Sequence, residues 1–141
     1  MRRKTILTCC WGVTLAYWAF MAVVTHIPQP RLPGVPVGDK TSHLIGYGTL
    51  ASMLFVTLWI ARPRDWSLTW KIPLILFVYG ALDEATQPLF NRSGEFADWV
   101  ADAAGALIAV AGWSLVRWAF STAKGQTSTS NIQHRTSNVE G

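Results

Sequence analysis

The stretch LFVYGALDEATQPLFNRSGEFADWVADAAGALIAV, residues 76–110, contains two apolar segments joined by a polar one. Carboxylates and one arginine, Arg92, lie between the two predicted helices and partly inside them. An apolar environment accepts ionised groups only where they are paired or bound to a ligand. The stretch therefore predicts a helical protein in which polar side chains converge on one site.

The whole chain is poor in charge for a soluble protein. Of its 141 residues, 50% are hydrophobic and 14% are charged, whereas a soluble domain carries roughly 25% charged residues. Long segments with few or no charges lie at 5–25, 41–61, 72–90 and 99–120. Because about 20 apolar residues cross a membrane as a helix, we expect four transmembrane helices. The predicted fold class is all-α, a polytopic membrane protein.

The basic residues predict the orientation of these helices. With the N-terminus in the cytoplasm, most Lys and Arg residues fall in inner segments, and the outer loops hold Arg31, Lys40 and Arg92. The positive-inside rule then places both termini in the cytoplasm, in a multi-pass protein of the cell inner (cytoplasmic) membrane. Basic residues beside an anionic inner leaflet account for the net charge of +4, so no nucleic acid is expected as a partner.

One membrane domain and one tail are expected. Residues 1–120 should form the four-helix transmembrane domain, with its motif core at about 39–112. Residues 121–141 are rich in Ser, Thr, Asn and Gln, which predicts a disordered cytoplasmic tail. The proline-rich segment 25–40 is expected to form an extended, ordered loop on the outer side.

Polar residues recur at helical spacing in the second, third and fourth segments. Three stripes are predicted, each on one face of a helix: Asp39, His43 and Tyr47; Asp83, Glu84 and Gln87; Asp98 and Asp102. Polar groups that face lipid are costly. We therefore expect the stripes to converge in a polar pocket that opens to the outer side between these helices.

Small residues accompany the last stripe at four-residue spacing, at Ala97, Ala101, Gly105 and Ala109. Small side chains at this spacing let two helix backbones approach closely. The fourth helix is therefore expected to pack tightly against a neighbour along this face.

The motifs DKTSHLIGYGTL (39–50) and ALDEATQPLFNRSGEFADWVADAAGALI (81–108) resemble the VanZ-like membrane protein family. The positions that match the family pattern are Asp39, Lys40, His43, Tyr47, Asp83, Glu84, Gln87, Arg92, Ser93, Asp98, Asp102 and Gly105. The resemblance covers roughly residues 20–115 and departs at Asp102, where the family often has Asn. It implies a small bacterial membrane protein, in a family named after a member associated with resistance to the glycopeptide antibiotic teicoplanin. That association fixes no reaction.

The matched polar positions are candidate ligand-binding residues. Arg92 and Lys40 fit the phosphate or carboxylate of a polar lipid head group or of a lipid-linked cell-envelope precursor. A second interpretation is an enzyme that acts on an envelope lipid, with His43 and a carboxylate such as Asp83 or Glu84 as the acid–base pair. A third is a proton- or ion-coupled transport component. Membrane lipids are the expected partners in all three, and no oligomeric state is predicted.

Acids outnumber bases in this predicted site. Four carboxylates face two permanent cations, Lys40 and Arg92. Either one carboxyl keeps a shared proton or a divalent cation binds. Oxygen-rich donors favour Mg²⁺ or Ca²⁺ over zinc, with His43 as the nitrogen donor. Asp83 and Glu84 are adjacent on a helix and point about 100° apart, so they need not share a partner.

Overall fold

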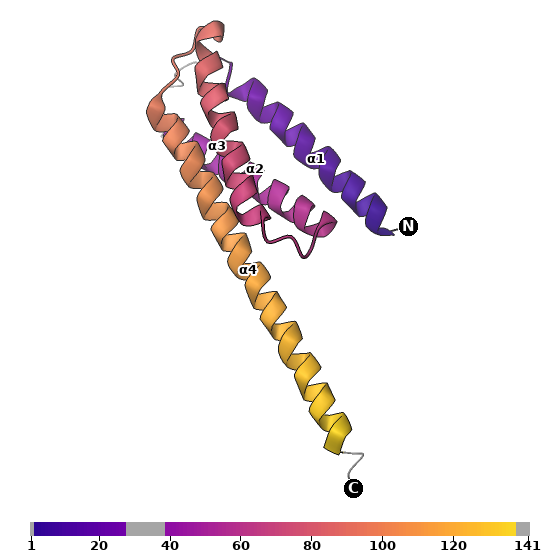
Figure 1. The fold of residues 1–141 in the computed structure, drawn as a ribbon. Coiled ribbons are helices and arrows are strands. Elements are labelled where there is room, and N and C mark those ends of the chain that lie inside the picture. Colours follow the sequence, from indigo (N-terminus) through magenta and orange to yellow (C-terminus); the bar gives the residue numbers. More distant parts are fainter. Residues whose placement is uncertain (1, 28–38, 138–141) are drawn as a thin grey trace. The chain divides into compact units, whose positions relative to one another are not determined.

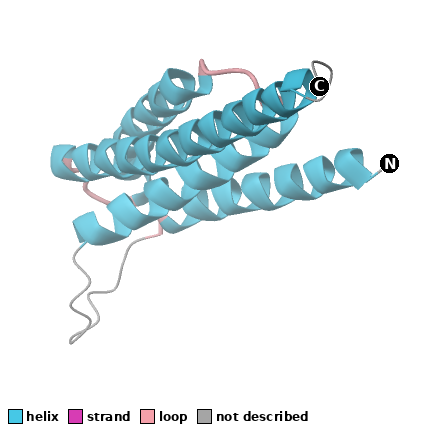
Figure 2. Ribbon diagram, turned by 90° about the horizontal axis from the view of Figure 1, so that it is seen from below, coloured by secondary structure: helices cyan, strands magenta, loops and turns pink. Residues whose placement is uncertain are grey.

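The computed structural model describes residues 2–27 and 39–137, and these residues are helical apart from short loops (Figure 2). Figure 1 traces α1 (Arg2–Val24), α2 (Asp39–Ala61), α3 (Leu68–Thr86), the 3₁₀ helix η1 (Gln87–Phe90) and α4 (Phe96–Ser137). No strand occurs within the described ranges. The all-α fold class is therefore confirmed for them.

Three helices are long and apolar enough to cross a membrane, over Arg2–Val24, Lys40–Ala61 and Phe96–Thr122. Helix α3 does not meet the same standard, because each of its 18-residue windows contains Lys71, Asp83 and Glu84. The expected third segment also differs in its limits. The sequence predicts residues 72–90, whereas α3 begins at Leu68 and ends at Thr86. The 3₁₀ helix η1 follows, with Pro88 in its first turn, where a proline is tolerated.

The chain divides into two compact units, Met1–Ala111 and Gly112–Gly141. The first contains α1, α2, α3, η1 and the beginning of α4, and the second contains the rest of α4. Residues 121–137 are helical, so the structure differs here from the expected disordered tail. Once a helix is nucleated, each further residue adds one hydrogen bond, and no proline interrupts this segment.

Helices α1 and α2 pack antiparallel in the first unit. Arg3 Nη2 donates to the carbonyl oxygen of Ile60 at 2.8 Å, so the start of α1 meets the end of α2. Between them, the buried hydroxyls of Thr14 and Thr57 lie 3.0 Å apart and satisfy each other. A hydrogen-bonded threonine pair is a typical contact between apolar helices that have few other polar groups to share.

Helix α3 packs against the beginning of α4, as the two ribbons in Figure 1 show. Trp99 Nε1 donates to the carbonyl oxygen of Phe77 at 3.1 Å, and the two rings are 4.4 Å apart. Tyr47 and Phe55 of α2 are among the fully buried side chains, while Leu82 and Ile108 are at least 60% exposed. Large apolar side chains on the outside of a helix bundle suit contact with lipid.

The tight helix contact predicted from small residues is made between α2 and α4. A Cβ atom at Gly105 would collide with the carbonyl oxygen of Leu44 and lie 3.1 Å from the backbone nitrogen of Gly48. A Cβ atom at Gly48 would lie 3.3 Å from the carbonyl oxygen of Gly105. The expectation of close approach at Gly105 is therefore confirmed, and Gly48 is its partner.

Two local devices shape the turns. In the α2–α3 connection, the hydroxyl and then the backbone N–H of Ser67 hydrogen-bond to Asp65, which holds the pKa of that carboxyl below its ordinary value. After η1, Asn91 has φ 58°, in the left-handed region that Asn tolerates better than most residues. This bend brings the N–H of Arg92 to 3.3 Å from the carbonyl oxygen of Gln87.

We predict that Gly105→Ala destabilises the protein by about 1–3 kcal/mol, because its methyl group has no room between α2 and α4. Gly112→Ala in the same helix is the matched control, since a Cβ atom there meets nothing within 4 Å. The control should be neutral or stabilising by up to about 1 kcal/mol, from helix propensity alone. Thermal unfolding of the purified variants in detergent measures both; equal effects would contradict the close approach.

Candidate functional site

The central contact of the site joins α2 to α4. Nδ1 of His43 lies 2.9 Å from Oδ1 of Asp102, and the two residues are 3% and 1% exposed. With Asp102 ionised, its oxygen can only accept a hydrogen bond, which assigns the proton of a neutral His43 ring to Nδ1. The Nε2 atom then offers its lone pair to the other side of the ring.

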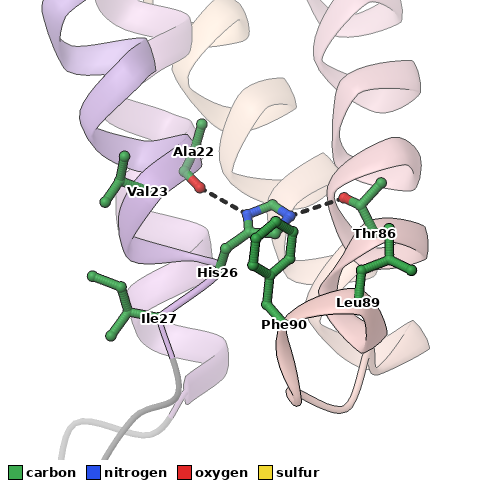
Figure 3. Close-up of a pocket in the computed structure, with 7 residues that line it drawn as sticks. All are labelled: Ala22, Val23, His26, Ile27, Thr86, Leu89 and Phe90. Carbon is green, nitrogen blue, oxygen red and sulfur yellow. Dashed lines mark hydrogen bonds between the residues drawn. The ribbon is translucent and has the colours of Figure 1, made fainter.

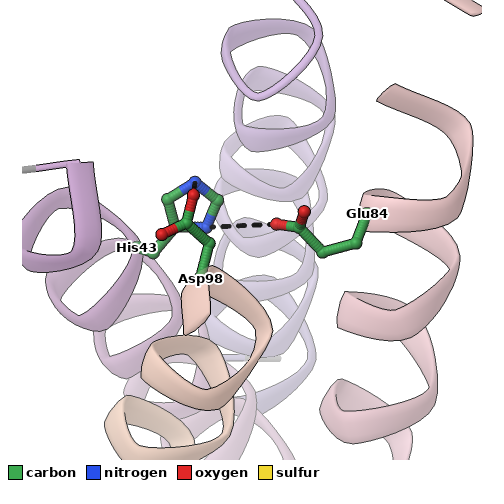
Figure 4. Close-up of side chains that lie close together, drawn as sticks. All are labelled: His43, Glu84 and Asp98. Atoms are coloured by element: carbon green, nitrogen blue, oxygen red, sulfur yellow. Dashed lines mark ion pairs between the residues drawn. The ribbon is translucent and has the colours of Figure 1, made fainter. Parts of the chain in front are cut away.

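Two further carboxylates flank the His43 ring. Glu84 Oε1 of α3 lies 3.9 Å from Nδ1, and Asp98 Oδ2 of α4 lies 3.9 Å from Nε2. Figure 4 shows both carboxylates directed at the imidazole from different helices. The Asp98 side chain is 2% exposed and that of Glu84 is 11% exposed. With Asp83 and Asp102, they form what we call the carboxylate cluster.

Arg92 brings a permanent positive charge to the same place. Its Nη2 lies 3.4 Å from Nε2 of His43, and its Nη1 donates to the carbonyl oxygen of Thr25 at 2.8 Å. The guanidinium therefore connects the imidazole to the end of the first helical segment. A planar guanidinium is also the side chain best suited to grip a phosphate or carboxylate.

Asp83 makes its direct contacts with the end of α1. The Thr25 hydroxyl donates to Asp83 Oδ1 at 2.9 Å, and Nδ1 of His26 lies 3.6 Å from the same oxygen. Glu84 instead accepts from the N–H of Glu95 at 2.8 Å. The two adjacent carboxylates thus have different direct partners, as their spacing on the helix allows.

Sequence reasoning missed Thr25 and His26 as members of the site. Both follow the long apolar segment of α1 directly, at the point where it ends. Their position at one end of an apolar helix could have indicated this, because side chains there lie at the same membrane depth as the ends of the other helices. Their partner on α3, Asp83, could not be identified without the packing.

His26 also borders an apolar cavity of about 520 Å³, between the end of α1 and η1. Figure 3 shows its ring bonded on both sides, with Nδ1 2.7 Å from the carbonyl oxygen of Ala22 and Nε2 2.9 Å from Oγ1 of Thr86. The ring of Phe90 packs edge-on against it at 4.8 Å. His26 thus separates this cavity from Asp83, so the cavity and the carboxylate cluster share one wall.

Several fully buried oxygens in the site make no hydrogen bond within the described part of the chain. They are Tyr47 Oη, Asp83 Oδ2, Gln87 Oε1 and Asp102 Oδ2. The other atom of the Gln87 amide, Nε2, donates to Glu84 Oε1 at 3.3 Å. Three of the four oxygens can only accept hydrogen bonds. With its carboxyls ionised, the site therefore has more acceptors than donors, and a shared proton, a donor group or a cation would satisfy them.

The structure brings five of the predicted residues close together: His43, Glu84, Arg92, Asp98 and Asp102. Gln87 joins them through Glu84, as their shared helix face predicted. Tyr47 is 0% exposed on the same face of α2 as His43.

The remaining predicted residues lie at the edge. Lys40 is exposed, with Nζ 3.4 Å from Glu95 Oε2 and 3.9 Å from Asp98 Oδ1. Ser93 is exposed in the loop after η1. The side chain of Asp39 lies outside the described residues, as does most of the loop expected at 25–40.

A comparison of the chain with protein-family models, with curated proteins and with solved structures finds no match.

We predict that Asp102→Asn is tolerated, within about 1 kcal/mol of the wild type, because the amide oxygen still accepts from His43 Nδ1 and one surplus charge is removed. Asp102→Leu leaves the buried N–H of His43 without an acceptor and should cost about 1–3 kcal/mol. Arg92→Ala, which removes the cation beside the cluster, should also cost more than Asp102→Asn. Thermal unfolding compares the three. If Asp102→Asn lowers the stability as much as Arg92→Ala does, the surplus of carboxylates does not destabilise the site.

Proposed function

We propose that this chain is a VanZ-like protein of the cell inner membrane with four transmembrane helices and cytoplasmic termini, whose polar site opens to the outer side. The three apolar helices and the bias of basic residues support the membrane placement. Helix α3 is the fourth span. Its carboxylates are accommodated because Asp83 contacts Thr25 of the α1 end and Glu84 contacts the backbone of Glu95.

The site binds a polar lipid head group or a lipid-linked cell-envelope precursor. One observation carries this proposal: an arginine, a histidine and four carboxylates from three helices and a loop meet in an otherwise apolar bundle. Ionisable groups at such a position are costly and are usually retained for function. A head group supplies both kinds of partner, since its phosphate fits Arg92 and Lys40 while its hydroxyls or amines donate to the unpartnered oxygens.

The apolar cavity beside His26 supports an amphiphilic ligand. It lies against the same wall as Asp83 and is about 520 Å³ in volume, enough for a segment of an acyl or polyprenyl chain. If the family resemblance holds, binding of such an envelope lipid would connect this protein to glycopeptide resistance.

An enzyme acting on an envelope lipid is the second candidate. The 2.9 Å contact between His43 Nδ1 and Asp102 Oδ1 favours it, because a carboxylate that orients a histidine is a common acid–base arrangement. The membrane lipid profile separates the two candidates: an enzyme changes it on expression of wild type but not of His43→Ala, whereas a binding protein leaves both profiles equal.

The topology predicts that Ser93→Cys is labelled from outside intact cells and that Arg64→Cys is labelled only after the inner membrane is permeabilised. Both positions are exposed, at opposite ends of α3. The variants are made in a background where Cys9 and Cys10 are replaced by serine, and a membrane-impermeant maleimide is the reagent. Labelling of both positions from the same side would show that α3 does not cross the membrane.

Head-group binding predicts that the double variant Lys40→Ala, Arg92→Ala loses capture of photo-crosslinkable phospholipid. The loss should be about tenfold, the amount expected from one or two charge-assisted hydrogen bonds. The matched control is Arg62→Ala, Lys71→Ala, which removes the same charge at the other end of α2 and α3. Equal crosslinking in the two double variants would contradict a phosphate at Arg92.

A further inference from the structure

We propose that the His43 side of the carboxylate cluster is a binding site for one divalent transition-metal ion, of the Mn²⁺ or Zn²⁺ type. One ligand atom each from His43, Glu84 and Asp98 lie within 4.8 Å of one another (Figure 4). Ligand atoms around such an ion sit roughly 3–4 Å apart, because each bond is about 2.0–2.2 Å long. The three ligand atoms are therefore close to the spacing that one shared ion requires.

The His43 ring is already oriented as a metal ligand. Asp102 Oδ1 accepts the proton of Nδ1 at 2.9 Å, so Nε2 carries the lone pair, which now faces Arg92 Nη2 at 3.4 Å. Carboxylate–histidine pairs of this kind fix the tautomer of ligating histidines and raise their basicity. Asp98 Oδ2 lies 3.9 Å from Nε2, and Glu84 Oε1 lies 3.9 Å from Nδ1.

The charges of the site favour a doubly charged ion. Four carboxylates face the permanent cations of Arg92 and of Lys40, whose side chain is 58% exposed. When all four carboxyls are ionised, a divalent ion supplies the two missing positive charges, and a shared proton would supply one of them. A bare phosphate cannot do so, because it adds negative charge and acceptors to a site that already has too many of both.

The burial of the site favours a small ion at its centre. His43, Asp98 and Asp102 are at most 3% exposed, so a ligand that reaches all of them must be compact. A second observation also calls for a cation. The Gln87 amide contacts Glu84 through Nε2, while its Oε1 is buried and makes no hydrogen bond. An amide oxygen beside a ligating carboxylate is a suitable additional donor.

The mixed donors decide the type of metal. Imidazole nitrogen favours zinc and other transition metals, whereas carboxylates and carbonyl oxygens alone suit Mg²⁺ and Ca²⁺. Because His43 lies at the centre, between Glu84 and Asp98, this site should prefer Mn²⁺ or Zn²⁺. The Mg²⁺ or Ca²⁺ expected from the sequence is the competing outcome of the metal-binding experiment.

The positive charge of Arg92 disfavours a metal ion at His43, so a substitution of Arg92 separates metal binding from anion binding. Its Nη2 lies 3.4 Å from His43 Nε2, where a metal has to approach. The guanidinium must move aside on binding, and its charge repels the ion. Arg92→Gln should therefore leave metal affinity unchanged or tighter, although the same change weakens the capture of an anionic head group.

The experiment is metal binding by the purified full-length chain in detergent after dialysis against EDTA, with Mn²⁺, Zn²⁺, Mg²⁺ or Ca²⁺ added alone. Wild type should bind one Mn²⁺ or Zn²⁺ per chain, and Glu84→Gln and Asp98→Asn should each bind at least about tenfold more weakly. Asp65→Asn, in the distant α2–α3 turn, is the control and should bind like wild type. No stoichiometric ion, equal affinity in all variants, or a preference for Mg²⁺ or Ca²⁺ overturns the proposal.

A spectroscopic measurement on wild type does not depend on whether the variants fold. Mn²⁺ bound to the chain should show hyperfine coupling to a histidine nitrogen in pulsed electron paramagnetic resonance, and its absence overturns ligation by His43. The proposal is independent of head-group binding. Metal bound without lipid capture contradicts only the proposed function, and lipid capture without metal contradicts only this inference.

Discussion

The hydrogen bond between His43 and Asp102 is the contact on which the polar site depends. It connects α2 to α4 across a short distance, 2.9 Å between Nδ1 and Oδ1, and two short side chains can span it only where the backbones are close. The crossing of Gly48 and Gly105, within two turns of these residues, provides that closeness. A feature of pure packing therefore sets the geometry of an ionisable pair, which explains why small and polar residues alternate along the same face of α4.

The two carboxylates of α3 are also positioned by the helices that pack around them. Asp83 and Glu84 occupy adjacent positions, yet one is satisfied by Thr25 of the α1 end and the other by the backbone of Glu95. Separate partners prevent two negative charges from competing for one donor in a medium of low dielectric. The remaining deficit of positive charge lies around His43, whose ring is flanked by Glu84, Asp98 and Asp102.

More of the helices than of the polar site could be predicted from the sequence. Long apolar segments identified α1, α2 and the first part of α4, because burial and lipid contact both require such segments. Spacing identified His43, Glu84, Asp98 and Asp102 as one site, since faces of helices are periodic. Spacing could not identify Thr25 and His26, which depend on how α1 packs against α3. Nor could composition anticipate that α4 continues to Ser137, because helix propagation depends on the preceding turns as much as on residue type.

The left-handed backbone of Asn91 has a consequence for how this protein tolerates change. Its φ of 58° ends η1 and directs Arg92 back toward the α1 end and His43. Most side chains disfavour this conformation, while Gly and Asp accept it. If every residue is tried at position 91, only a narrow set should therefore be tolerated, although the position is exposed. Position 91 should be as sensitive to substitution as Arg92 and more sensitive than the neighbouring surface positions.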